Sequence, residues 1–302
     1  MRIEALFLTA LLWCVATGVE ASLPILGEHL EYTLKFRGLI TGYVELTIAK
    51  LTLQVEEKMA QVADTSAYIT TMQLTTEPFL KAELLYPVRL NYRSWLDVQK
   101  LHPLIVVKSL RTREESEDFF WFDWDSRYAY HYQAGKESKS ESELQTPPIH
   151  LQPVTSLSQE EWSALIQKQA QDIGDTDALD YMGLYYRLRN SPLESGRTIT
   201  FSTYTGEKIE NIHVDVKQEQ LVCDGWNRAA FRLVLREIDP DSGDLGDEVQ
   251  LWVSDDKERL LLRFYAKRTF GAIDGVLDTG RPEEAKGLSE ATRSSLETYL
   301  DF

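Results

Sequence analysis

The sequence predicts a mainly β protein, α+β at most, built on an antiparallel curved sheet, either a β-barrel or a half-barrel. Three observations predict this class. Apolar and polar residues alternate in many short stretches up to residue 134 and again after residue 197. Glycine-containing or acidic turns separate many of these stretches, and helical periodicity appears only between the two blocks and in the tail. This order is typical of a sheet with helices packed on it or filling it.

The chain begins with the layout of a secretory signal peptide. Arg2 precedes an uncharged apolar run from Ala5 to Val19, and Val19 and Ala21 fit the positions that signal peptidase reads. The run is shorter than the about 20 apolar residues of a membrane-spanning helix. We therefore expect cleavage after residues 1–21, export to the periplasm, and no transmembrane segment in the mature chain.

Two cysteines bear on processing and stability. Lipidation at Cys14 is an alternative to cleavage after Ala21, but the bulky Trp13 disfavours it because a lipobox has a small residue before the cysteine. With cleavage, Cys223 is the one thiol left and no internal disulfide forms. Its strand-like, apolar context favours a buried inert thiol over a reactive one.

The charge balance excludes some partner classes. The chain has 32 basic and 48 acidic residues, a net charge of −16. Nonspecific nucleic-acid binding and docking on an anionic membrane both need a basic footprint. We therefore expect no nucleic-acid partner.

The mature chain, residues 22–280, reads as a single β-rich domain. Alternation in residues 32–36 and 44–48, with Gly38 and Gly42 between them, predicts an antiparallel hairpin. Further strands are predicted within residues 61–74, 90–98, 101–115, 118–133, 197–218, 221–238 and 248–280.

The middle and the end of the chain differ in composition from the strands. Residues 134–153 are polar and end in prolines, which predicts a surface excursion. Two helices are predicted within residues 156–189, the first from the capping-box pair Ser158 and Glu161. The second rests on a stripe of apolar residues at helical spacing, Tyr181, Leu184, Tyr185 and Leu188. Residues 281–302 form a polar, helix-prone tail.

With these elements in place, the chain resembles the exported bacterial family called domain of unknown function 3108. The resemblance rests on GEHLEY with Gly38 and Gly42, on DALDYMGLYYRLR, and on LWVSDDKERLLLR followed by GAIDGVL, in this order over about residues 27–280. It implies a periplasmic or envelope-associated β-rich protein and supplies no catalytic residues. The polar segment at 134–153 and the helical tail depart from the family.

Asp255 and Asp256, in LWVSDDKERLLLR, are adjacent carboxylates that suggest catalysis, ligand contact or a turn. Adjacent residues on a strand point to opposite faces, whereas glycosidase carboxyls face each other across a sugar. Acidic residues between two apolar runs match hairpin chemistry, because they accept hydrogen bonds from nearby backbone N–H groups. A turn is the expectation, with a ligand-facing role second.

No metal or cofactor site is predicted. The acidic loop at 239–248 offers oxygen ligands for Ca²⁺, but it lacks the residues of a calcium loop at its strictest positions, which favours a solvated hairpin. The five histidines show no metal-ligand spacing, and no phosphate loop or nucleophile elbow is present. Arg187 and Arg189 end the second helix, where a capping role is favoured over anion binding.

The aromatic block FFWFDWDSRYAYHY supplies the candidate binding residues. Alternation places Phe119, Trp121 and Asp123 on one side of a strand and Phe120, Phe122 and Trp124 on the other. Both faces are apolar, so either both pack into cores or one lines a cavity or stacking platform. The predicted ligand-binding residues are Trp121, Trp124, Tyr128, Tyr130, Tyr132 and Tyr185.

The function favoured by the sequence is a non-enzymatic envelope protein that binds an apolar or polymeric component, a lipid or glycan, or another envelope protein. One alternative is a cell-wall or surface-glycan hydrolase with carboxylates from distant strands. Another is an assembly factor that pairs through a sheet edge. Periodicity does not choose among them, because it shows alternation without showing which face is inside.

Overall fold

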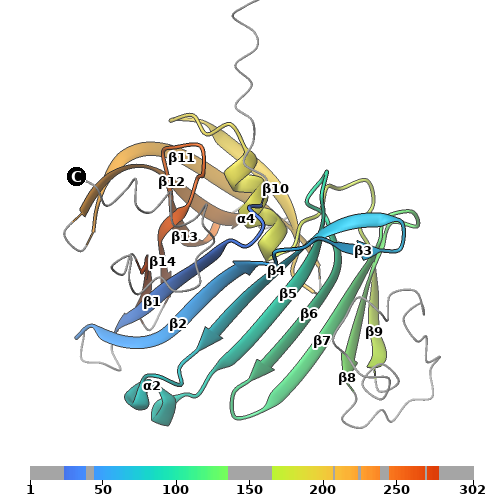
Figure 1. The fold of residues 1–302 in the computed structure, drawn as a ribbon, viewed down its shortest axis with the longest axis horizontal. Helices are drawn as coiled ribbons and strands as arrows, with labels where there is room; N and C mark the ends of the chain where they lie inside the picture. The colour runs from blue at the N-terminus through green and yellow to red at the C-terminus, as the bar shows by residue number, and fades with distance from the viewer. Residues whose placement is uncertain are drawn as a thin grey trace, which may run out of the picture.

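A computed structural model describes residues 24–38, 44–134, 165–206, 208–223, 226–238, 245–268 and 271–278. They form one antiparallel sheet of 15 strands (Figure 1). The order is β10-β11-β12-β13-β14-β15-β1-β2-β4-β5-β6-β7-β8-β9, with β3 paired to β4 beside this path. The predicted signal peptide, most of the polar excursion and the helical tail lie outside the described residues.

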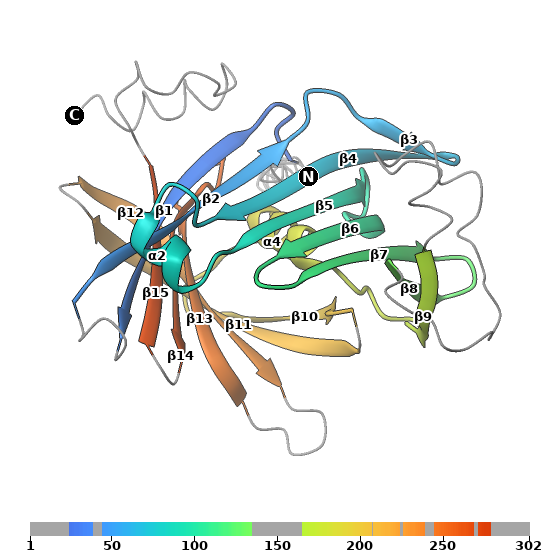
Figure 2. The ribbon, with the colours of Figure 1, turned by 90° about the horizontal axis from the view of Figure 1, so that it is seen from below.

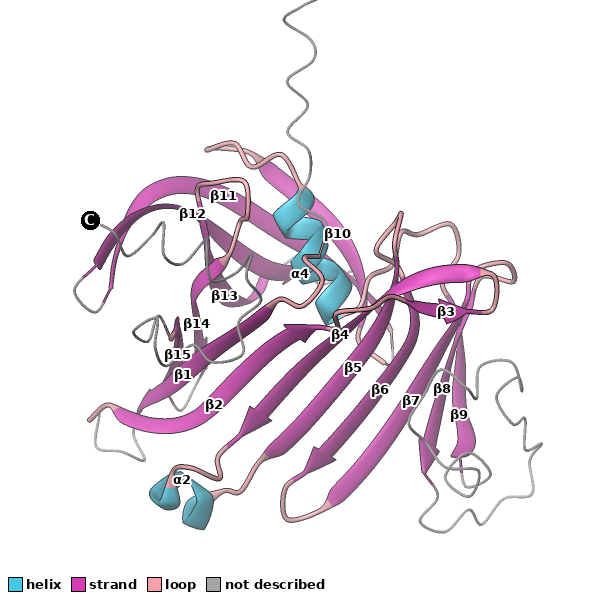
Figure 3. Cartoon of the chain, viewed as in Figure 1, coloured by secondary structure: helices cyan, strands magenta, loops and turns pink. Residues whose placement is uncertain are grey.

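The first half of the sheet contains β1 (His29–Gly38), β2 (Leu46–Val55), β3 (Ala60–Val62), β4 (Thr65–Thr75), β5 (Arg89–Asp97), β6 (Pro103–Arg111), β7 (Glu115–Asp123), β8 (Tyr128–Ala134) and β9 (Leu165–Asp172). The second half contains β10 (Thr198–Tyr204), β11 (Ile209–Cys223), β12 (Trp226–Ile238), β13 (Leu245–Ser254), β14 (Leu261–Arg268) and β15 (Gly271–Leu277). Two described helices, α2 (Leu80–Leu85) and α4 (Tyr181–Asn190), complete the set (Figure 3).

The sheet curves strongly but does not close. Strand β1 joins its two halves, because it pairs with β2 on one side and with β15 on the other. Strands β9 and β10 end the strand order and do not pair with each other over the residues described. Figures 1 and 2 show the two halves bending around α4. The predicted mainly β, curved antiparallel fold is confirmed, in its half-barrel form.

Helix α4 fills the concave side of this half-barrel. Asp180 caps it, with a carboxylate oxygen 2.7 Å from the Gly183 amide. Seven of its ten residues are buried, which is more than one apolar stripe would bury. Five of them, Met182, Leu184, Tyr185, Tyr186 and Leu188, belong to the main core together with inward side chains of both halves of the sheet. The second predicted helix is therefore confirmed, although Tyr181, predicted on its buried face, is 52% exposed.

The first predicted helix is wrong where the structure describes it. Residues Leu165–Asp172 form β9, which pairs with β8 along its length. The helix prediction followed local propensity, but pairing with β8 satisfies backbone groups that would otherwise lie at a bare sheet edge. Ser158 and Glu161, the capping-box pair, lie outside the described residues.

The Arg187 and Arg189 prediction is also wrong, because neither side chain caps the helix. Arg189 is completely buried, and its Nη1 and Nη2 atoms lie 2.7 and 2.9 Å from the two carboxylate oxygens of Glu28. It also donates to the Glu258 carbonyl oxygen at 2.7 Å. Arg187 donates to the Lys100 carbonyl oxygen and to Asp177.

This ion pair ties three distant segments together: the start of β1, the end of α4, and the β13–β14 turn. Tyr186 adds a hydrogen bond to Glu28 at 3.2 Å. Burial alone would lower the pKa of Arg189, but the adjacent Glu28 carboxylate raises it above the usual value. Arg189 therefore stays charged, and both Glu28 oxygens and the Glu258 carbonyl oxygen accept hydrogen bonds from it.

We predict that Arg189→Met destabilises the fold by about 3–5 kcal/mol, because it leaves the Glu28 carboxylate buried without its partner. Urea unfolding followed by circular dichroism measures the loss. The double variant Glu28→Leu/Arg189→Met is the control, since it removes both charges and is expected to recover most of the stability. A double variant as unstable as the single one would contradict this account.

Candidate functional site

A small hollow, open to solvent, lies beside the start of α4, and the space inside it that a water-sized molecule can reach is about 20 Å³. Strands β5, β6 and β7 form one wall, and the end of β10 with the turn after it forms another. That space holds about one water molecule, so a ligand would lie over the mouth of the hollow and not inside it. The described residues that line it are Tyr92, Val106, Lys108, Phe120, Phe122, Asp180, Tyr181, Tyr204, Thr205 and Gly206.

Aromatic rings form the floor of the hollow. Phe120 and Phe122 point inward from β7, and the Tyr204 ring meets that of Phe122 edge-on, with centroids 5.4 Å apart. Gly206 closes over them with a φ of +103°, and a Cβ there would lie 3.0 Å from the Phe120 ring. The positive φ favours glycine here, and the close approach leaves little room for a side chain.

A buried carboxyl group forms the polar wall. Asp180 is 1% exposed and accepts hydrogen bonds from the Tyr92 hydroxyl at 2.9 Å and from the Gly183 amide. Burial raises the pKa of Asp180, although the hydrogen bonds it accepts oppose the shift. Burial also raises the pKa of Tyr92, and Asp180 adds to that rise. The hydroxyl of Tyr92 is therefore a donor whose proton stays in place at neutral pH.

Behind the aromatic floor lies a buried histidine. His131 on β8 stacks on Phe120 with ring centroids 4.3 Å apart, and its Nε2 lies 2.6 Å from the Asp118 carboxylate. The histidine side chain is 5% exposed, and its Nδ1 has no hydrogen-bond partner in the described structure. Lys108 on β6 lies opposite Asp118 in the sheet register. The concave face of the sheet therefore places charged side chains and aromatic rings next to each other near the hollow.

Four of the six predicted binding residues lie together, but on the outer face of the sheet. Trp121 and Tyr130 stack with centroids 4.9 Å apart, and Tyr128 lies 6.2 Å from Tyr130. Tyr132 is 1% exposed, and burial raises its pKa to about 12. These residues adjoin a second apolar cluster around Trp95. Core packing thus occupies much of both faces, and a ligand role for this group stays a prediction.

Trp124 and Tyr185 lie apart from that group. Trp124 stacks on His102 at 4.3 Å, and its indole N–H donates to the Pro103 carbonyl oxygen. Tyr185 is buried in the main core, with Arg189 over its ring at 5.3 Å. The six residues therefore do not converge on one site. Phe120 and Phe122, on the opposite side of the same aromatic strand, line the hollow instead.

Asp256 forms a turn, as the sequence predicted. Its Oδ1 atom accepts from the amides of Glu258 and Arg259, both at 3.0 Å, and from the Ser254 hydroxyl. Asp255 accepts a hydrogen bond from Gln218 instead. The turn presents the Glu258 carbonyl oxygen to Arg189, so its role is to support α4.

Within the described ranges, the other motifs form neither a metal-binding site nor a membrane-spanning helix. No group of three or more His, Cys, Asp or Glu residues there could hold a metal ion. None of the described helices is long and apolar enough to cross a membrane. Most of the acidic loop, residues 239–244, lies outside those ranges, and Cys223 is partly rather than fully buried.

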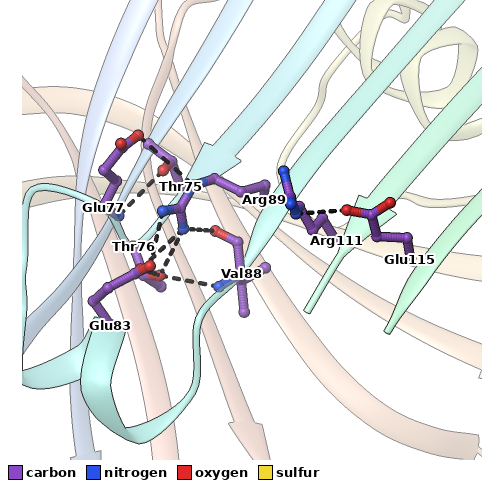
Figure 4. Close-up of polar contacts among 8 residues, drawn as sticks. All are labelled: Thr75, Thr76, Glu77, Glu83, Val88, Arg89, Arg111 and Glu115. Atoms are coloured by element: carbon purple, nitrogen blue, oxygen red, sulfur yellow. Dashed lines mark hydrogen bonds and ion pairs between the residues drawn. The ribbon is translucent and has the colours of Figure 1, made fainter. Parts of the chain in front are cut away.

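A second polar cluster lies at one end of the sheet, where Arg89 and Arg111 are opposite each other in the register of β5 and β6 (Figure 4). Arg89 binds both carboxylate oxygens of Glu83, at 2.8 and 2.9 Å, and lies 3.7 Å from Glu77. Arg111 pairs with Glu115 at 2.7 Å. Opposed like charges destabilise a sheet, so these carboxylates offset the repulsion.

Sequence reasoning missed Tyr92, Asp180 and Tyr204 in the hollow. They come from β5, the start of α4 and β10, and no spacing in the sequence joins them. One signal was available: Asp180 directly precedes the helical pattern, which marks it as an N-cap. That pattern shows where the helix starts and not what lies against it.

The fold and the hollow together define a class: a half-barrel of one antiparallel sheet, filled by one helix, with a small aromatic site at the helix start. The chain belongs to the family described as Protein of unknown function (DUF3108), whose model matches residues 31–278. The resemblance seen in the sequence is therefore confirmed.

A solved structure shares this fold. It is titled Crystal Structure of Beta-barrel-like Protein of Domain of Unknown Function DUF1849 from Brucella abortus. It superposes with a TM-score of 0.50 at 8% sequence identity and covers 85% of this chain and 97% of its own. This likeness shows the fold alone. Among curated proteins, none matches the sequence.

We predict a difference between two substitutions at Asp180. Asp180→Ala is expected to cost about 1 kcal/mol or more of stability, because the cap of α4 is lost. Asp180→Asn keeps one acceptor for Gly183 and removes the buried charge, so it is expected to cost less. Urea unfolding of both variants tests this, and equal losses would contradict a capping role.

The difference in stability between the wild type and Asp180→Asn is also expected to depend on pH. Because the pKa of Asp180 is raised in the folded state, the folded protein binds more protons, and the stability of the wild type relative to Asp180→Asn falls as pH rises above about 4. Unfolding at a series of pH values measures this slope. A relative stability that rises with pH would contradict the raised pKa.

For the second cluster we predict an acid-resistant contact. The hydrogen bonds from Arg89, followed by that from Thr76, lower the pKa of Glu83 to about 2. The stabilisation is present above the ordinary glutamate pKa and is lost only as pH falls through about 2. Carboxyl ¹³C NMR of Glu83 measures the pKa, and Arg89→Met is expected to return it towards 4.5. An unchanged pKa in that variant would contradict the assigned cause.

Proposed function

We propose that this chain is a non-enzymatic binding protein of the cell envelope, exported to the periplasm, that binds an apolar or aromatic group of an envelope component at the mouth of the hollow beside α4. The supporting observation is a hollow that opens to solvent beside the start of α4, with buried aromatic rings beneath it and the exposed ring of Tyr181 at its rim. Apolar walls with few polar groups are typical of binding sites.

Different lining residues would contact different parts of a ligand. Phe120, Phe122 and Tyr204 are buried beneath the hollow and make its floor apolar. Tyr181 stands at the start of α4, is 52% exposed, and has its ring 5.9 Å from that of Tyr92. Lys108 adds a cation that suits a ligand with an anionic group beside its apolar part.

Two features disfavour the hydrolase alternative. Asp180 is the one acidic residue among the described residues that line the hollow, and both its oxygens already accept hydrogen bonds. A glycosidase pair needs a second carboxyl group across the substrate, about 5–10 Å away. Asp255 and Asp256, the adjacent pair in the sequence, belong to the β13–β14 turn and do not line this hollow.

Native mass spectrometry of the protein purified from its exported compartment tests the proposal. We expect an added mass that denaturing extraction releases, and Tyr181→Ala is expected to reduce its occupancy. Tyr128→Ala is the matched control, since Tyr128 is 38% exposed on the outer face. Loss of the ligand in Tyr128→Ala alone would move the site to the outer aromatic group, and a protein with no added mass would contradict the proposal.

A further inference from the structure

Helix α2, between β4 and β5, exposes two leucine side chains to solvent. Leu80 and Leu84, one turn apart, are 72% and 76% exposed, and Tyr86 just after the helix is 58% exposed. Ala82, with its small side chain, is buried, at 7%. In a surface helix of a globular protein the large apolar residues face the core. Leu80 and Leu84 do not follow this rule.

This exposed arrangement is held in place. A helix of six residues is too short to be stable alone, and Phe79 provides no side-chain cap. The contact of Glu83 with Arg89 and Thr76 fixes it to the sheet end (Figure 4). Thr76 also accepts a hydrogen bond from the Val88 amide at 3.0 Å. The leucines are therefore displayed on a braced element.

The charges of this segment differ from those of the whole chain. Residues 76–89 carry two acidic and two basic side chains and are neutral, in a chain of net charge −16. Both glutamates lie within ion-pair distance of Arg89. Lys81 is exposed and has no ion pair with any described residue. The charge of Lys81, next to the exposed leucines, is therefore not balanced by an ion pair with a described residue.

The area of the exposed apolar surface on α2 helps to decide whether a protein or a lipid surface covers it. Leu80, Leu84 and Tyr86 present on the order of 300 Å² of apolar surface. Each partner in a standard protein interface buries about 800 Å². Two copies of a chain this acidic would also repel each other. A lipid surface needs only a few apolar side chains to enter the boundary between headgroups and acyl chains.

We propose that α2 docks this protein on a lipid bilayer surface of low net charge. Leu80 and Leu84 enter the acyl boundary, Tyr86 lies at the level of the headgroups, and Lys81 faces their phosphates. The overall acidity of the chain opposes docking on strongly anionic lipid, which fits the expectation from composition. This inference does not depend on the ligand in the hollow.

Flotation with vesicles of phosphatidylcholine and phosphatidylethanolamine tests the proposal. The purified exported protein is expected to float with the vesicles, also at high salt, because the contact is apolar. In Leu80→Ser/Leu84→Ser the partition coefficient is expected to fall at least about tenfold. Its melting temperature is expected to stay unchanged, since both side chains are exposed in the free protein.

The matched control is Val222→Ser/Leu245→Ser, which removes two other exposed apolar side chains, 70% and 51% exposed. It is expected to float like the wild type. Failure of the wild type to float, or an equal loss in the control, would overturn the proposal. So would light scattering that shows a dimer which Leu80→Ser/Leu84→Ser converts to a monomer, because a second copy would then cover the leucines.

Discussion

The ion pair between Glu28 and Arg189 is the constraint on which this fold depends. A sheet that curves without closing leaves a concave face that something must cover, and here one ten-residue helix covers it. A helix with so many buried residues has little surface on which to place charge. Arg189 is nevertheless buried, and it is tolerated because both Glu28 oxygens and the Glu258 carbonyl oxygen satisfy it. The pair thereby fixes the depth and rotation of α4.

The position of α4 in turn creates the hollow. Its end is held by the ion pair, and its start is held by Asp180, which bonds both to the helix amide and to Tyr92 on β5. The aromatic floor of β7 continues past the helix start, where Tyr204 and Gly206 return from the other half of the sheet. The hollow therefore lies where the concave face of the sheet extends beyond the start of the short helix α4.

Strand β5 connects the two surfaces that we assign to function. Arg89 at its first residue braces α2, and Tyr92, three residues later, lines the hollow. A protein held at a lipid surface through α2 would keep the hollow at a fixed offset from that surface. The two surfaces remain chemically separate, since one presents leucines to lipid and the other presents rings to a single group.

The sequence by itself determined the mainly β class, the early hairpin, the helix that forms α4 and the Asp256 turn, because these follow from local periodicity and turn chemistry, and its motifs pointed to the family. It also identified the aromatic strand pair, but alternation does not say which face is inside, so Phe120 and Phe122 were passed over for Trp121 and Tyr130. Only the tertiary structure decided that residues 165–172 form a strand, because an exposed edge of β8 outweighed helical propensity. It alone placed Arg189 against Glu28, 161 residues away in the chain. Contacts of that span depend on how the sheet curves, and curvature is a property of all its strands together.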